Sequence, residues 1–152
     1  MKILVLSAGD RMSLGWSYAR GLTALGHEVQ VLDPMDTLGH WRLWHNRVAK
    51  RLLERQLLWR FGQVLKRTVL EQGTFDAIFV PKGAWALPGL WRALKAARPR
   101  TLLVCYNADD PITTWSRGAN RPWVTEAIPC YDLYITYNQS LMEPIRQAGA
   151  KE

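Results

Sequence analysis

The stretch Leu102-Leu103-Val104-Cys105-Tyr106-Asn107-Ala108-Asp109-Asp110-Pro111 gives the clearest indication of both the fold and a site. Its apolar first half predicts a buried strand of a parallel sheet. Asp109 and Asp110 follow that strand directly, and open α/β sheets bind ligands at the carboxyl ends of their strands. Pro111 disfavours a helix immediately after Asp110. We therefore expect both carboxylates in a loop that faces a cleft, with a solvated turn of no function as the alternative.

Apolar strands alternate with helical segments along all 152 residues, which predicts an α/β fold with right-handed βαβ crossovers. We expect one Rossmann-like domain over residues 1–152, a doubly wound parallel sheet with strand order 3-2-1-4-5. The last segment, Gln147-Ala-Gly-Ala-Lys-Glu152, is typical of a helix end before a further strand. We therefore expect a fragment of a longer protein, with a naturally short protein as the alternative. The predicted strands are 2–7, 28–32, 75–80, 101–106 and 132–137, and the predicted helices are 15–25, 41–71, 86–97, 122–127 and 140–148.

The net charge of +7 is confined to one segment. Residues 40–67 hold eight basic residues and a single acid, Glu54, whereas the remaining residues carry equal numbers of each sign. Apolar residues of the predicted helix 41–71 form two stripes, one of which should pack on the sheet while the other remains available to a partner. The first stripe is Trp41, Trp44, Val48, Leu52 and Trp59, and the second, roughly opposite, is Leu53, Leu57, Phe61 and Val64.

The available stripe of the basic helix 41–67 has several candidate partners. Packing within a larger protein is one explanation, and peripheral contact with an anionic membrane is another, because basic charge and interfacial tryptophan favour acidic lipid. An acidic ligand is a third. Nucleic acid is disfavoured, since neither a recognition-helix motif nor an aromatic and basic strand platform accompanies the helix.

The loop after the first strand occupies the phosphate position of a Rossmann fold. Gly9 and Gly15 stand six residues apart without the GxGxxG spacing, so dinucleotide binding is weakly supported even though Asp33 ends the second strand. We expect Gly9 and Asp10 to line a cleft for a polar ligand, and the alternative is a simple turn. Lys82-Gly83 follows the third strand, where the lysine could pair with an anionic ligand or with the two aspartates.

Other chemistries lack support in the sequence. Cys105 and Cys130 are not spaced as CxxC, and both lie in contexts that predict buried, unbonded thiols. HExxH and GxSxG motifs are absent, so we expect no metal and no resident cofactor. Receiver domains carry their acid pair after the first strand, which disfavours phosphotransfer signalling here. No signal peptide or membrane-spanning stretch is present, which predicts a cytoplasmic protein.

Several segments together resemble one family, the N-terminal half of GT-B glycosyltransferases of the CgeB-like (spore-maturation) type. The most specific are the Asp109-Asp110-Pro111 turn and the Tyr131-Asp132-Leu133 strand start. The resemblance spans nearly the whole chain. It implies two Rossmann-like domains around a cleft, of which the N-terminal one receives the acceptor and the C-terminal one holds most of the nucleotide-sugar donor. The segments that carry it are Ile3–Leu6, Gly26–Val29, Asp76–Gly83, Tyr106–Pro111, Ile128–Thr136 and Gln147–Ala150.

The resemblance implies transfer of a sugar from a nucleotide-sugar donor to an acceptor hydroxyl, without a bound metal. Asp109 or Asp110 would deprotonate or orient that hydroxyl, and only one of them should face the cleft because neighbouring side chains on extended backbone point in opposite directions. The donor-binding domain is missing from this chain, so we expect the chain alone to bind acceptor weakly and to catalyse nothing. The alternative is a non-catalytic, Rossmann-like nucleotide-binding module. The residues expected to bind substrate are Gly9, Asp10, Lys82, Gly83, Tyr106 and Asn107.

Overall fold

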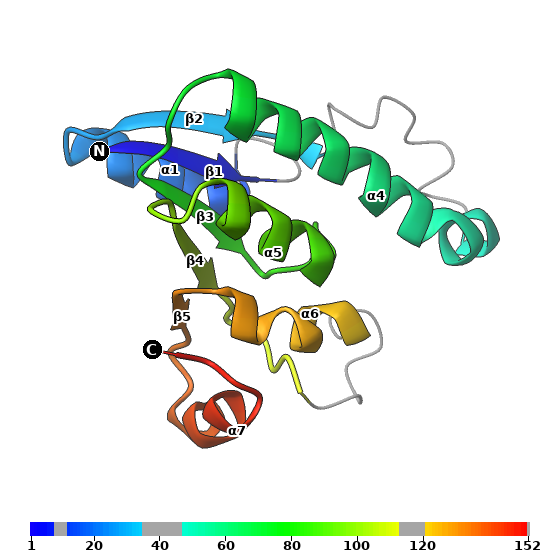
Figure 1. Ribbon diagram of the computed structural model, residues 1–152. Coiled ribbons are helices and arrows are strands. Elements are labelled where there is room, and N and C mark those ends of the chain that lie inside the picture. Colours follow the sequence, from blue (N-terminus) through cyan, green and yellow to red (C-terminus); the bar gives the residue numbers. More distant parts are fainter. Residues whose placement is uncertain (8–11, 35–46, 113–120, 152) are drawn as a thin grey trace.

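Five parallel strands form a single sheet in the order β2-β1-β3-β4-β5 in the computed structural model (Figure 1). The structure describes residues 1–7, 12–34, 47–112 and 121–151. The predicted α/β class and doubly wound parallel sheet are confirmed, because helices lie on both faces of this sheet. The strands are β1 (Lys2–Leu6), β2 (Glu28–Leu32), β3 (Ala77–Pro81), β4 (Leu102–Tyr106) and β5 (Leu133–Ile135).

The predicted strand order 3-2-1-4-5 is wrong, because β3 pairs with β1 on the side away from β2. The burial of the two strands explains this order. Polar Glu28 and Gln30 alternate with apolar residues in β2, and no residue of this strand is fully buried, as on a sheet edge. Four of the five residues of β3 are buried, and a strand covered on both faces belongs inside a parallel sheet. The topological switch point, where ligands bind in such sheets, therefore lies between β1 and β3.

One helix covers one face of the sheet, and the other long helices cover the opposite face (Figure 1). Helix α1 packs Ala19 against Ile3 and Val5 of β1. On the other face, Phe61 of α4 and Trp91 of α5 belong to the larger core, together with the inward side chains of the central strands. The helices are α1 (Leu14–Ala24), α4 (Arg47–Glu71), α5 (Pro88–Ala97), α6 (Pro122–Glu126) and α7 (Met142–Gln147), with short 3-10 turns η1 (Ile128–Cys130) and η2 (Gln139–Leu141).

Helix α4 packs on the sheet through a stripe that the sequence analysis placed incorrectly. The buried residues are Leu58, Phe61, Leu65 and Val69. Of the second predicted stripe, only Phe61 belongs to this set, and Val64 is exposed, because the packing side of the helix is rotated from the predicted one. Of the first predicted stripe, Val48, Leu52 and Trp59 are exposed, whereas Trp41 and Trp44 lie outside the described residues. No helix among the described residues is long and apolar enough to cross a membrane.

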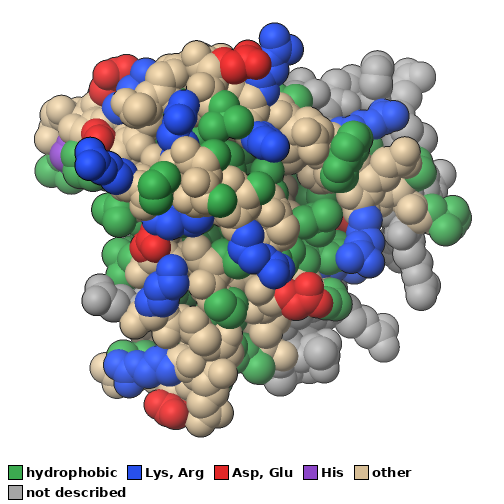
Figure 2. All heavy atoms as spheres, in the orientation of Figure 1, with side chains coloured by type: hydrophobic (Ala, Val, Ile, Leu, Met, Phe, Trp, Pro, Cys, Tyr) green, Lys and Arg blue, Asp and Glu red, His purple; other side chains and the backbone are tan. Residues whose placement is uncertain are grey.

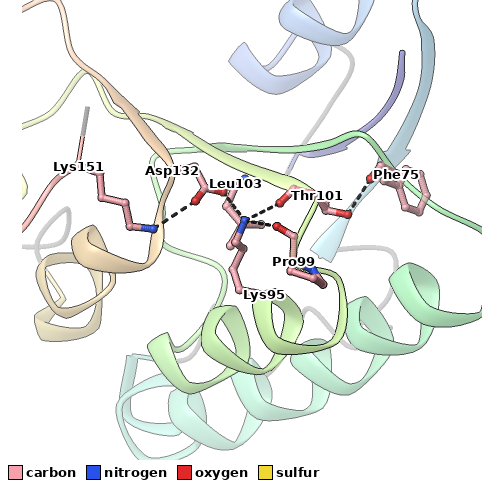
Figure 3. Close-up of polar contacts among 7 residues, drawn as sticks. All are labelled: Phe75, Lys95, Pro99, Thr101, Leu103, Asp132 and Lys151. Atoms are coloured by element: carbon pink, nitrogen blue, oxygen red, sulfur yellow. Dashed lines mark hydrogen bonds and ion pairs between the residues drawn. The ribbon is translucent and has the colours of Figure 1, made fainter.

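A polar cluster around Asp132 ties α5, β4 and β5 together at the amino ends of the strands (Figure 3). The Lys95 ammonium donates to the Asp132 carboxylate at 2.8 Å and to the carbonyl oxygen of Thr101 at 3.0 Å. The same carboxylate accepts from the backbone N–H of Leu103 at 3.0 Å and from Lys151 at 3.2 Å. Although burial opposes it, hydrogen bonding from these groups lowers the pKa of Asp132. Asp132, which lies in one of the most specific segments of the resemblance, thus stabilises the fold.

Candidate functional site

The candidate site lies at the carboxyl edge of the sheet, beside the switch point between β1 and β3. Ser7 follows β1 there and is 2% exposed, and its hydroxyl lies 2.9 Å from that of Ser13. The first turn of α1 meets this strand end closely, because a Cβ atom added to Gly15 would lie 2.5 Å from both Cβ and Oγ of Ser7. Glycine at this position therefore allows α1 to begin directly at the carboxyl end of β1.

The turn after β3 holds two successive residues in the left-handed region. Lys82 has φ +65° and Gly83 has φ +66°, and the Lys82 N–H donates to the Tyr106 carbonyl at 2.7 Å. A left-handed lysine is strained by about 1–2 kcal/mol, and such strain often marks a functional loop. Gly83 also has little room, since an added Cβ would lie 3.4 Å from the Cys105 sulfur and from the Tyr131 hydroxyl. This conformation directs the Lys82 side chain toward the loop after β4.

Lys82 and Asp109 form an ion pair at this edge. Their Nζ and Oδ2 atoms are 3.1 Å apart, and the side chains are 57% and 43% exposed. The structure therefore brings together two of the predicted site residues that are 27 positions apart in the sequence. An exposed pair of this kind contributes about 0–1 kcal/mol to stability, so a bound ligand can displace either partner at little cost.

Asp110 and Asn107 hold the shape of the loop that presents Asp109. The Asp110 carboxylate accepts from the backbone N–H of Ile112 at 2.8 Å. The side-chain Oδ1 of Asn107 accepts from the backbone N–H of Asp109 at 3.0 Å. The Asn107 side chain is buried, and its amide donates to the Tyr134 hydroxyl at 3.2 Å. Side-chain bonds of Asn and Asp to backbone two residues onward stabilise turns. Asn107 therefore has a clear positioning role, while its predicted contact with substrate stays a prediction.

Two tyrosines and a phenylalanine form an aromatic group on the α1 face of the same edge. The Tyr18 ring lies 5.0 Å from the Phe79 ring and 5.2 Å from the Tyr106 ring, centroid to centroid. Burial and a hydrogen bond with Tyr106 raise the pKa of Tyr18 to about 12. The two tyrosine hydroxyls therefore lie together at this edge, where they offer polar groups beside the aromatic rings. Sequence reasoning missed Tyr18, although its spacing of three residues from Gly15 places both on one side of α1.

A buried layer beneath the edge contains a thiol that takes no part in nucleophilic chemistry. Burial raises the pKa of Cys105 to about 12, so the thiol stays protonated. Burial likewise raises the pKa of Tyr131, whose hydroxyl lies beside the Cys105 thiol but forms no hydrogen bond of good geometry with the described residues. Cys105 and Cys130 are both buried free thiols, as the sequence predicts. Among the described residues of this edge, the groups that remain for contact with a ligand include the Asp109 carboxylate, the Lys82 ammonium and phenolic hydroxyls.

The remaining predicted residues lie elsewhere. Gly9 and Asp10 are outside the described residues. Asp33 follows β2 and is half-buried. Within residues 1–7, 12–34, 47–112 and 121–151, no group of three or more His, Cys, Asp and Glu side chains is arranged to hold a metal ion.

Comparison with known proteins adds little to this description. The sequence matches no protein-family profile and no curated protein. Among solved structures, the chain is similar to a chain in the crystal structure of the histidine kinase ThkA in complex with the response regulator protein TrrA. The two are 11% identical, with a TM-score of 0.46 over 97% of each chain. A similarity of this degree carries no argument about function, so the functional argument depends on the site itself.

Proposed function

We propose that the chain is the acceptor-side domain of a glycosyltransferase, which transfers a sugar from a nucleotide-sugar donor to an acceptor hydroxyl bound at the carboxyl edge of the sheet. The observation that carries the proposal is the Lys82–Asp109 ion pair beside the switch point. The left-handed turn after β3 positions Lys82, and the hydrogen-bonded loop after β4 positions Asp109. The resemblance of the sequence to CgeB-like GT-B enzymes supports the same function.

Asp109 is the residue best placed to act on an acceptor hydroxyl. Its side chain is 43% exposed and contacts the more exposed Lys82, whereas a carboxylate oxygen of Asp110 is engaged by the Ile112 N–H. A general base must lie within hydrogen-bond reach of the proton that it removes, which requires an accessible oxygen. Asp110 then positions the loop rather than touching the reacting atoms.

The phenolic hydroxyls provide the polar contacts that a sugar-like or polyhydroxylated acceptor requires. The Tyr18 and Tyr106 rings contact each other in a tilted arrangement at the α1 face of the edge, and tyrosine side chains offer both an apolar ring and a polar hydroxyl. The nucleotide sugar would be bound mainly by a second domain, so this chain alone should bind acceptor weakly and catalyse nothing.

Sugar transfer by the complete protein that contains this chain tests the proposal. In Asp109→Asn, turnover should fall by about 10²–10⁴-fold while the fold stays intact. Glu143→Gln, which removes an exposed carboxylate from α7, should retain full activity. Full activity of Asp109→Asn would remove Asp109 from the mechanism, and full activity of both the Asp109→Asn and Asp110→Asn single variants would leave only a structural turn.

A non-catalytic nucleotide-binding module is the competing function. The close start of α1 behind β1 favours it, because phosphates bind at helix N-termini that follow the first strand of such sheets. Titration of this chain with UDP and with NADH separates the two functions. Binding of either nucleotide in the micromolar range by this chain alone would favour the binding module, whereas the glycosyltransferase proposal predicts no such binding.

A further inference from the structure

The outward side of α4 exposes apolar side chains in a row. Val48, Leu52 and Trp59 are 69%, 77% and 58% exposed, and they recur at helical spacing along one side of the helix. We call these three residues with Arg55 and Lys66, which lie on the same side, the outer stripe of α4. Large apolar side chains that are aligned and exposed to this extent mark an interaction surface.

The charge along this stripe is of one sign. Arg55 and Lys66 are both exposed. The single acid of the segment, Glu54, is 9% exposed and points inward, where its carboxylate pairs with Arg121 at 3.0 Å. Because Glu54 is already neutralised inside the protein, it does not offset the outward cations. Figure 2 shows the result as basic and hydrophobic side chains that adjoin one another over the region of α4.

The apolar surface continues from α4 onto α5. Trp59 borders a groove of about 250 Å³ between the two helices, whose lining also includes Leu90, Ala93 and Lys66. Gly62 forms part of this groove, because a Cβ at this position would lie only 3.3 Å from a methyl group of Leu90. The outer stripe is therefore the rim of a broader apolar and basic surface.

We propose that the outer stripe of α4 binds the surface of an anionic lipid bilayer. The arrangement fits an interfacial helix, in which aliphatic and tryptophan side chains enter the headgroup region while arginine and lysine meet lipid phosphates. Nucleic acid would use the cations but would gain nothing from the exposed Val48 and Leu52. This inference does not depend on glycosyl transfer, since it uses no residue of the candidate site.

The inward side of α4 is joined to the elements that carry the candidate site. The helix runs back from the carboxyl edge of the sheet, and its first half extends past that edge (Figure 1). Glu54, in this first half, contacts Arg121. The neighbouring Trp123 donates its indole N–H to the carbonyl of Ala84, just after the Lys82-Gly83 turn. These contacts connect the inward side of α4, opposite the outer stripe, to the turn that carries Lys82.

Vesicle sedimentation tests the proposal on this chain. The chain should pellet with vesicles of phosphatidylcholine mixed with phosphatidylglycerol, but not with phosphatidylcholine alone. Binding should weaken strongly between about 0.1 M and about 1 M salt, over which the Debye length falls from about 10 Å to about 3 Å. In Arg55→Gln/Lys66→Gln, the partition coefficient should fall by about 10–30-fold, because each cation near an anionic surface contributes about 1 kcal/mol. Leu52→Gln/Trp59→Gln should also reduce binding, by about tenfold or more.

Matched controls separate this surface from net charge and from general hydrophobicity. Arg100→Gln/Arg146→Gln removes two exposed cations elsewhere, and Leu25→Gln/Tyr137→Gln removes two exposed apolar groups elsewhere. Both control variants should bind as the wild type does. The proposal is overturned if the chain stays in the supernatant with anionic vesicles, or pellets equally with neutral ones. Sedimentation without vesicles would instead indicate self-association, and equal loss in stripe and control variants would indicate unspecific charge attraction; either result also overturns it.

Discussion

Replacement of Gly15 by alanine should destabilise the protein, because the start of α1 lies directly against the end of β1. The new methyl group would lie 2.5 Å from Cβ and Oγ of the buried Ser7 and 3.0 Å from its Cα, so a backbone segment must move. Overpacking of this kind costs about 1–3 kcal/mol or more, against which alanine gains at most about 1 kcal/mol in helix propensity. Because the contacts include backbone, the cost should lie at the upper end of that range, and we expect a net loss of about 2 kcal/mol in the free energy of unfolding, measured by urea denaturation followed by circular dichroism.

Gly21 provides the matched control for this experiment. It lies in the same helix and is exposed, and a Cβ atom there would meet no atom within 4 Å. Gly21→Ala should therefore raise the free energy of unfolding by about 0.5–1 kcal/mol. If Gly15→Ala were as stable as the wild type, or gained stability as Gly21→Ala should, the close approach of α1 to Ser7 would be refuted, and with it the described shape of this side of the site.

Three further predictions concern the buried polar groups. Asp132→Asn should cost about 2–3 kcal/mol at pH 7, because the largely buried Lys95 loses its charged partner. Since the folded-state pKa of Asp132 is lowered, its contribution is present above the unfolded pKa of about 4 and is lost as the pH falls through the folded pKa. The stability curves of wild type and variant should thus begin to converge as the pH falls below about 4, and a gap of constant size down to the lowest pH at which the protein stays folded would contradict the assignment. Tyr131→Phe should leave stability unchanged or raise it by up to about 1 kcal/mol, because the hydroxyl has no described partner; a loss above about 1 kcal/mol in thermal denaturation would show that it has one. In a Cys130→Ser background, Cys105 should not react with Ellman's reagent until urea unfolds the chain, because burial raises the pKa of its thiol to about 12; fast labelling of the native protein would contradict its burial.

The sequence was sufficient to predict the alternation of strands and helices, because each element has its own local apolar pattern. The order of the strands is not a local property, and the prediction failed there. The polar residues Glu28 and Gln30 are typical of an edge strand. They identify β2 as the edge only when its sequence is compared with that of the more deeply buried β3. The prediction of the packing side of α4 failed for a similar reason. Apolar residues occur on several sides of this helix, and contact with the sheet determines that Leu58, Phe61 and Leu65 are the buried ones.

The candidate site was predictable to the extent that strand ends define it. Each of three predicted site residues follows a strand: Lys82 and Gly83 follow β3, and Asp109 follows β4. Because parallel strands end at the same edge of the sheet, the fold class alone predicts that these residues lie near one another. The aromatic group around Tyr18 was not predictable, because it joins α1 to a residue 88 positions later in the sequence. The positive φ of Lys82 also carries no sequence signal, since lysine is not a residue that favours this conformation.

The most direct measurement of the central claim is nuclear magnetic resonance of the isotope-labelled chain during titration with a panel of simple saccharides, with UDP and NADH as comparison ligands. The account predicts weak saccharide binding that shifts the backbone amide signals of Lys82, Gly83 and Asp109, and that is lost in Asp109→Ala, while UDP and NADH leave these signals unchanged. Two results would contradict the assignment of this edge as the acceptor site. Either the saccharides shift only amide signals of residues elsewhere, or the signals of Lys82, Gly83 and Asp109 shift with UDP or NADH but not with any saccharide.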